Sequence, residues 1–171
     1  VQDTISAAQE ARLPGSVLWS GPVQGTGFPD LQKKCAQEMA KLPFAVHPVG
    51  SIVPKLISYD FKTVIKAVIN AKKHLPPGRP IHAFGAGHPM FFALLAASGA
   101  DLFDSAAYAL YAKEGRYMTT SGTSMLNDLI ELPCSCPICS SHKAGEIDER
   151  LLALHNLHVT FQELSLIHIS E

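Results

Sequence analysis

The sequence lacks a charge excess of either sign and lacks any long apolar run. It carries 14 lysines and arginines against 15 aspartates and glutamates, for a formal net charge of -1. This balance does not indicate nucleic-acid binding by bulk charge, although it leaves room for a local basic patch. The most apolar stretch, residues 90–97, is too short to cross a bilayer, and the first residues do not resemble a signal peptide. We therefore expect no membrane association.

Cysteine is also scarce, and it is distributed unevenly. Of the four cysteines, Cys35 stands alone and is expected to be a small core residue. The other three, Cys134, Cys136 and Cys139, lie within residues 133–139. A secreted domain held by disulfides would spread its cysteines along the chain, so this usage favours a reducing, cytoplasmic location.

The cysteine run predicts a metal site. Thiolates at this spacing can face one point, and zinc is the usual occupant of such a set. A tetrahedral site needs a fourth ligand, and both His155 and His158 lie shortly downstream on an apolar periodic segment. Three cysteines and one histidine leave no open position, so one structural Zn²⁺ per chain is expected to hold the fold. The alternative is a disulfide with a spare thiol.

A repeat of strand and helix precedes the cysteine run. Apolar patterns and turn residues predict four strands and three intervening helices. The strands are expected over residues 17–24, 44–49, 81–84 and 101–104, and the helices from Asp30, from Asp60 and over residues 90–98. Such repeats favour parallel pairing with right-handed crossovers. A whole (β/α)8 TIM barrel needs about 250 residues, so the pattern predicts the C-terminal half of one, with a flavodoxin-like open sheet as the alternative.

The repeat breaks after the fourth strand. Aromatic alternation over residues 108–118 predicts a hairpin around Gly115, and residues 147–157 predict a closing helix. The region of about residues 119–160 is therefore expected to form an inserted zinc-binding subdomain. Residues 164–171 match no expected element and resemble an in-frame sequencing adapter, the alternative being a terminal strand. The chain also opens on Val1 without an initiator methionine, so we expect a partial domain.

Candidate functional residues lie where the predicted strands end, because barrel enzymes carry their sites at the carboxyl ends of strands. Gln24 has an amide that suits the edge of a nucleobase, and Gly50 allows close backbone approach to a ligand. Phe84 could form an apolar wall. Asp104 is a carboxylate in an apolar strand, so it must be hydrogen-bonded or functional. Each also has a plainer explanation as a turn or cap residue, and Asp101 competes with Asp104.

Several motifs together resemble one enzyme family. They are Gly21–Gly25, His47–Pro54, Phe84–Pro89, Asp101–Ser105, Tyr108–Lys113, the cysteine run and Leu152–Leu157. This combination, spread over residues 19–163, resembles the tRNA-guanine transglycosylases, most closely the archaeosine type. The resemblance implies a (β/α)8 barrel with a zinc subdomain, of which residues 1–163 would be the C-terminal part of the catalytic domain.

The resemblance also implies an activity. A guanine at position 15 in the D-loop of tRNA would be exchanged for 7-cyano-7-deazaguanine, a 7-deazaguanine base, through a covalent aspartyl-ribosyl intermediate. Asp104 resembles the nucleophile of the family. The groups that resemble its base-binding residues are Gln24, the backbone of Gly50, Ser51 and Ile52, and Phe84. The zinc ligands would be Cys134, Cys136, Cys139 and His155, which favours His155 over His158.

The resemblance implies tRNA as a partner, and a homodimer through the zinc-lobe region is expected as well. The further catalytic carboxylates of the family belong to its N-terminal half, which lies outside the matched motifs, so this chain alone is expected to be inactive. Two other functions stay open: a noncatalytic, zinc-stabilised tRNA-binding or assembly paralogue, and a queuosine-type transglycosylase. A pure binding module has no need of Asp104 beside Gln24, and a glycosidase or aldolase barrel has no need of the zinc lobe.

Overall fold

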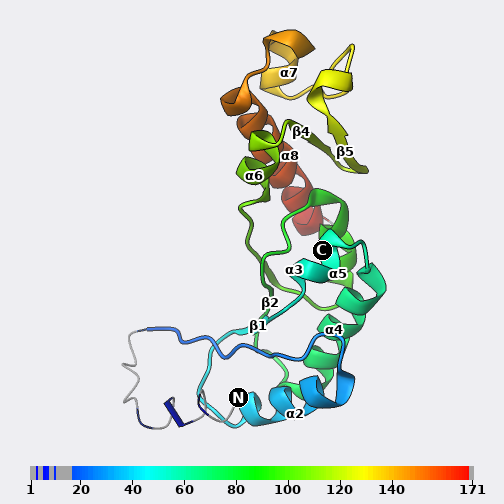
Figure 1. The fold of residues 1–171 in the computed structure, drawn as a ribbon. Helices are drawn as coiled ribbons and strands as arrows, with labels where there is room; N and C mark the ends of the chain where they lie inside the picture. The colour runs from blue at the N-terminus through cyan, green and yellow to red at the C-terminus, as the bar shows by residue number, and fades with distance from the viewer. Residues whose placement is uncertain (1–2, 4–5, 8–9, 11–16, 170–171) are drawn as a thin grey trace. The chain divides into compact units, whose positions relative to one another are not determined.

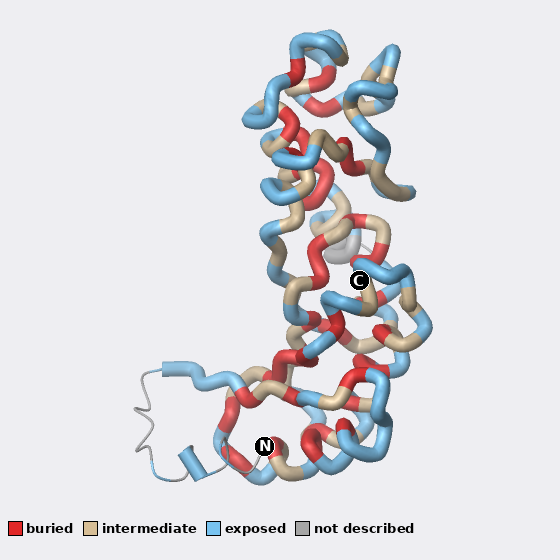
Figure 2. Tube along the Cα trace, viewed as in Figure 1, coloured by how far each residue is buried: buried red, intermediate tan, exposed pale blue. Residues whose placement is uncertain are grey.

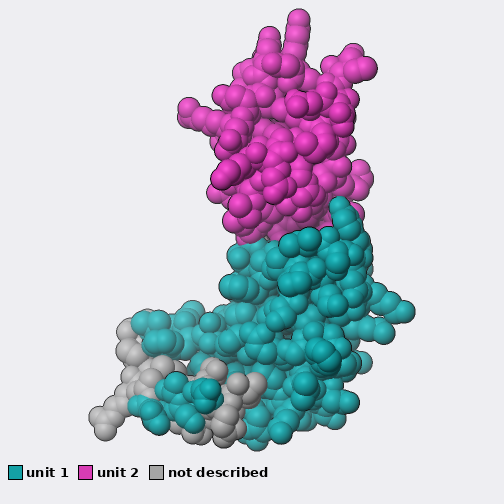
Figure 3. Space-filling view, viewed as in Figure 1, with its two compact units in different colours: residues 1–86, 94–104 teal, residues 87–93, 105–171 magenta. Residues whose placement is uncertain are grey.

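The computed structural model describes residue 3, residues 6–7, residue 10 and residues 17–169 (Figure 1). It divides into two compact units (Figure 3). We call residues 1–86 and 94–104 the sheet unit, and residues 87–93 and 105–171 the lobe unit. The α-helices and strands are α2 (Pro29–Ala40), β1 (His47–Val49), α3 (Val53–Ile57), α4 (Phe61–His74), β2 (Ile81–Ala83), α5 (Phe92–Ala97), β3 (Leu102–Phe103), α6 (Ala107–Lys113), β4 (Arg116–Thr119), β5 (Gly122–Met125), α7 (Pro137–Ser141) and α8 (Glu149–Ile169).

The sheet unit is built on a parallel sheet in the order β1-β2-β3. The predicted strand over residues 17–24 contributes only two parallel bridges to its edge, Ser20 to Val46 and Val23 to Val49. Neighbouring strands in space are thus neighbours in sequence, as in a barrel. The mixed α/β class and the parallel pairing are confirmed. The half-barrel itself stays a prediction.

Burial alternates along β2 but not along β1. In β2, Ile81 and Ala83 are fully buried, whereas His82 is half-buried and Phe84, which follows the strand, is exposed. Successive side chains of a strand point to opposite faces, so His82 and Phe84 lie on the less covered side of β2, while all three residues of β1 are buried (Figure 2). Helix α4 contacts β1 and β2 and packs against α2.

The helices of the sheet unit largely follow their predicted signals. Asp60 caps α4 as expected, because its carboxylate accepts the Thr63 N–H at 3.3 Å. The predicted cap at Asp30 is wrong: α2 begins with Pro29, Asp30 lies in its first turn, and Phe28 precedes the helix without a side-chain cap. Proline suits the first helical position because the N–H there has no partner in the helix. The predicted helix over residues 90–98 is a 3₁₀ turn, Pro89–Phe91, followed by α5.

The lobe unit departs further from prediction. Residues 108–113 belong to α6, so the predicted hairpin around Gly115 is wrong. Three alanines favour helix here, and Gly115 follows the helix with a φ of +69°, which suits a glycine after a helix end. The hairpin comes later, as antiparallel β4 and β5.

The closing helix is longer than predicted. It is α8, which runs to Ile169, so residues 164–169 are helical and the alternative of a terminal strand is wrong. The origin of the segment from residue 164 stays a prediction. No helix among the described residues combines the length and apolarity that a membrane crossing needs.

Candidate metal centre and strand-end site

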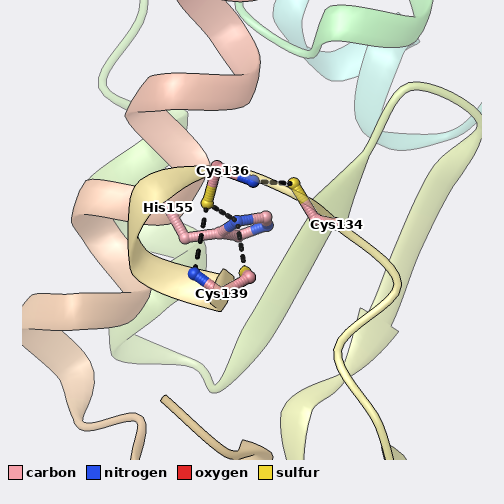
Figure 4. Close-up of side chains that lie close together, drawn as sticks. All are labelled: Cys134, Cys136, Cys139 and His155. Carbon is pink, nitrogen blue, oxygen red and sulfur yellow. Dashed lines mark hydrogen bonds between the residues drawn. The ribbon is translucent and has the colours of Figure 1, made fainter. Parts of the chain in front are cut away.

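The three clustered cysteines and His155 meet at one point in the lobe unit (Figure 4). Their ligand atoms all lie within 4.8 Å of one another. The Nδ1 atom of His155 is 3.4 Å from the Cys136 sulfur and 3.3 Å from the Cys139 sulfur. Zinc bonds of ordinary length in a tetrahedron place sulfur and nitrogen about 3.6 Å apart. The donor set therefore fits a tetrahedral zinc ion.

Neighbouring residues fix the orientation and the tautomer of His155 for metal binding. Its Nε2 donates to the Met118 carbonyl at 2.9 Å, which leaves Nδ1 as the lone-pair atom that faces the sulfurs. The ring stacks on Tyr117 at a centroid distance of 3.8 Å, and the Tyr117 hydroxyl lies 3.2 Å from the Cys139 sulfur. Such outer partners fix the orientation of metal-ligating histidines. Sequence reasoning did not identify Tyr117, and no spacing signal points to it.

Cys136, Cys139 and His155 are buried, and Cys134 is half-buried. Burial raises the pKa of Cys139 to about 12 and also raises the pKa of Cys134. It lowers the pKa of His155, against the hydrogen bond to Met118 that raises it. The thiolate forms of Cys134 and Cys139 are therefore unfavourable without a compensating cation, whereas the neutral histidine can bind one. A divalent cation would supply the missing charge.

The local backbone explains how the cysteines come together. Cys136 precedes α7, where its sulfur accepts the Cys139 N–H at 3.5 Å. The Cys134 sulfur accepts the Cys136 N–H at 3.4 Å. None of the four cysteines forms a disulfide, so the disulfide alternative is not supported. His158 is exposed and lies outside the cluster, as the resemblance implied.

Asn156, beside the histidine ligand, anchors the helix that carries it. Its buried side chain accepts the Met118 N–H at 2.9 Å and donates to the carbonyls of Tyr108 and Arg116 at 3.2 and 3.1 Å. One amide thus joins α8 to α6 and β4, and it fixes the position of His155 relative to Met118 along the helix axis.

In the sheet unit, the register places the predicted strand-end residues in one row. Val23 pairs with Val49, Val49 with Ala83, and Ala83 with Phe103. The residues that follow these four are Gln24, Gly50, Phe84 and Asp104. Because parallel strands end at the same edge, all four lie together at the carboxyl edge of the sheet.

Gln24 lies directly on Gly50. A side chain at position 50 would meet the Gln24 amide within 2.6 Å, so it would displace the amide from this position. The hydroxyl of Ser51 donates to Gln24 Oε1 at 3.1 Å. Ser51 has a φ of +60°, a left-handed conformation that glycine adopts more readily. The amide is therefore held in place but remains exposed to a ligand.

The backbone N–H and C=O groups of residues 50–52, after β1, are of two kinds: some are hydrogen-bonded within the protein, and others can bind a ligand. The Gly50 N–H donates to Val23 and its carbonyl accepts from Thr26, so both are committed within the protein. The Ile52 carbonyl accepts from α3, and the Ile52 side chain is fully buried. Among the described residues, none bonds the Ser51 backbone groups or the Ile52 N–H. Those are the groups that a ligand can reach.

Asp104 lies at the same edge and is distinct from Asp101. One oxygen of Asp104, Oδ1, accepts from His82 Nε2 at 2.7 Å and from the Gly85 N–H at 2.6 Å. Its side chain is 49% exposed. Asp101 precedes β3 at the opposite edge, where it accepts the Ile81 N–H at 2.8 Å and pairs with Lys72 at 3.2 Å. Asp101 therefore has a structural role.

His82 is the residue at this edge that sequence reasoning missed, because it was taken as structural. Period-two alternation along β2 puts His82 and Phe84 on one face, and that signal could have found it. Phe84 is 53% exposed and meets the His82 ring edge-on at 5.4 Å. His47, by contrast, is buried as expected and bonds the Gly21 carbonyl at 2.9 Å. Cys35 is buried too, and its sulfur accepts the Gln24 N–H at 3.3 Å.

Comparison with known proteins identifies the family of the chain. The family model described as TGT, Queuine tRNA-ribosyltransferase, matches residues 1–170. The chain belongs to this family. It is 51% identical over 161 residues to the tRNA-guanine(15) transglycosylase of Methanocaldococcus jannaschii, a match that covers 88% of this chain and 25% of the relative.

Two further relatives carry the same name. The Methanosarcina acetivorans protein is 49% identical over 160 residues, covering 91% of this chain and 33% of the relative. The Thermococcus kodakarensis protein is 47% identical over 169 residues, covering 95% of this chain and 29% of the relative. The transglycosylase-family chain described here thus spans a quarter to a third of the length of these curated relatives.

Proposed function

We propose that this chain is the C-terminal half of the catalytic barrel of an archaeosine-type tRNA-guanine transglycosylase. The enzyme would exchange guanine at position 15 in the tRNA D-loop for 7-cyano-7-deazaguanine. The observation that carries the proposal is the row at the carboxyl edge of the sheet, where the exposed Asp104 carboxylate and the Gln24 amide follow paired residues. The relatives named tRNA-guanine(15) transglycosylase support guanine 15 as the base that is removed.

The proposed reaction uses the two groups in different ways. An oxygen of Asp104 attacks the anomeric carbon of the ribose, the bond from that carbon to the guanine nitrogen breaks, and its electron pair leaves with the base. The carboxylate first stabilises the oxocarbenium charge and then forms the covalent intermediate. The incoming base displaces the carboxylate and restores the nucleoside. The proton that the departing guanine takes up would come from a protonated carboxyl group of the N-terminal half, and the resulting carboxylate would take back a proton from the incoming base.

Base recognition would fall to the neighbouring groups. The Gln24 amide can both donate and accept at the base edge, beside the available backbone groups of Ser51 and Ile52. Phe84 offers an exposed ring as a wall of the pocket. The target nucleoside must leave its stack to reach them.

The remaining parts of the proposal concern assembly. Cys134, Cys136, Cys139 and His155 would hold one structural zinc ion, which fixes the lobe and takes no part in the exchange. We also propose tRNA as the partner, a homodimer through the zinc-lobe region and a cytoplasmic location.

The test uses a reconstituted enzyme, in which this chain replaces the matching segment of the Methanocaldococcus jannaschii relative. Asp104→Asn keeps the shape of the side chain but removes its charge. We expect the covalent tRNA adduct, detected on denaturing gels, to disappear and exchange of labelled guanine to fall about a thousandfold or more. Asp101→Asn is the matched control and should keep both. An adduct that persists in Asp104→Asn would contradict the proposal.

A further inference from the structure

We infer that His82 is the positioning residue of the nucleophile: together with the Gly85 N–H it holds Asp104 by one oxygen and leaves the other to attack. This inference rests on the proposed function, since it names the residue that orients the proposed nucleophile. It starts from the short contact between His82 Nε2 and Asp104 Oδ1, at 2.7 Å.

Both donors to Asp104 converge on the same atom. The Gly85 N–H reaches Oδ1 at 2.6 Å, so this oxygen has two hydrogen bonds, whereas no described residue donates to Oδ2. A carboxylate held in this way cannot rotate freely without losing both bonds. The oxygen without a partner keeps its lone pairs for bond formation, and the two donors fix its direction.

The fold holds the donors as firmly as it holds the carboxylate. His82 lies within β2 and pairs in register with Leu102, two residues before Asp104, so both side chains lie on one face of adjacent strands. The imidazole is 18% exposed and meets the Phe84 ring edge-on. Gly85 has a φ of +77°, which turns the chain after β2 and brings its N–H to the carboxylate.

The geometry separates His82 from the binding groups. Gln24 and Ser51 follow the neighbouring strands, and neither shares a hydrogen bond with His82. Loss of the imidazole should therefore affect the formation of the covalent bond more than the binding of tRNA or free base. A misplaced nucleophile can lose about a hundredfold in rate.

The experiment compares His82→Ala, His82→Gln and the control His74→Ala in the reconstituted enzyme. His74 lies at the end of α4, away from this edge. We expect His82→Ala to slow single-turnover adduct formation about a hundredfold while KM for tRNA changes less than about threefold. The side-chain amide introduced by His82→Gln retains a donor, so this variant should recover at least about tenfold of that loss. His74→Ala should match the parent enzyme.

Three results would overturn the inference. One is an adduct rate in His82→Ala within about twofold of the parent. The second is an equal loss of adduct rate in His82→Ala and His82→Gln, and the third is a loss that appears in KM alone. Zinc content and the urea midpoint, measured for each variant, show whether the fold is intact. Failure of the proposed function gives a different result, because the adduct would then persist in Asp104→Asn regardless of the residue at position 82.

Discussion

The metal cluster and the strand-end site are built on opposite plans. In the lobe unit, four ligands face one another, all within 4.8 Å, and three of them are buried. In the sheet unit, Gln24, Phe84 and Asp104 are exposed and face outward from an edge. The first arrangement is complete within this chain, whereas the second offers groups to something that the described residues do not supply.

This difference determines which property can be tested with this chain alone, metal binding by the lobe or catalysis at the sheet edge. A closed donor set needs only its metal, and its binding energy contributes directly to the folding of the lobe. An open row of polar groups needs both a ligand and the remaining strands of the barrel. Four experiments can test this difference between the enclosed cluster and the open site, and their expected effects range from the loss of activity to a small change in stability.

The largest effect should come from dividing the catalytic unit. This chain alone should exchange no guanine in tRNA, because its sheet, among the described residues, lacks the further barrel strands and the carboxylates that they carry. The reconstituted enzyme should be active. The measurement is incorporation of labelled guanine under the same conditions for both proteins. Efficient exchange by the chain alone would show that the strand-end site is as self-contained as the cluster.

The next effect concerns the metal. His155→Ala should abolish stoichiometric zinc, measured by elemental analysis, and should unfold the lobe, since structural zinc binds with about 10–16 kcal/mol in small domains. His158→Ala is the matched control, because His158 is exposed on the same helix. Cys136→Ser should behave like His155→Ala. Full zinc retention in both ligand variants would contradict the assignment.

A smaller effect should follow at the base-binding group. Gln24→Ala in the reconstituted enzyme should weaken binding of the free base by about 1–3 kcal/mol, because its polar partners are left unpaired. Gln37→Ala, on the exposed surface of α2, is the control and should change nothing. Competition between labelled guanine and the free base gives the affinity. Equal affinity in Gln24→Ala and the parent would argue against base reading by this amide.

The smallest effect is a dependence of stability on pH in the lobe unit. Burial, with the nearby charge of Arg116, lowers the pKa of His88 from 6.5 to about 4. The unfolded chain then binds more protons than the fold, so His88 costs stability as the pH falls from 6.5 towards 4. His88→Asn keeps an acceptor for the Met90 N–H but does not titrate.

Urea unfolding of the reconstituted enzyme at about pH 7 and about pH 5 measures this effect. The variant should lose about 1–2 kcal/mol less than the parent over that interval. The same loss in both proteins would show that His88 is already accessible to protons in the fold.

The sequence predicted the cluster better than the site, for a physical reason. Metal ligands are a matter of residue type and spacing, so the three clustered cysteines and a histidine at position 155 or 158 could be named in advance, and the family resemblance then favoured His155. Alternation along β2 could have placed His82 on the same face as Phe84, but its contact with Asp104 depends on the register that sets β2 against β3, and single residues do not encode register. Likewise the helix over Ala107–Lys113 was missed because tyrosine favours strands by residue type, whereas the three-residue spacing of Tyr108 and Tyr111 and the alanines around them suit a helix.

The placement of the aromatic residues gives the two units separate optical signals. Trp19 is the sole tryptophan, and it lies in the sheet unit, where its carbonyl accepts the Ala45 N–H at the sheet edge. Tyr117 is fully buried in the lobe unit against the histidine ligand. Tryptophan emission would therefore follow the packing of added barrel strands, and the near-ultraviolet circular dichroism of tyrosine would follow chelation. A single unlabelled sample can therefore report on the sheet unit and on the lobe unit separately.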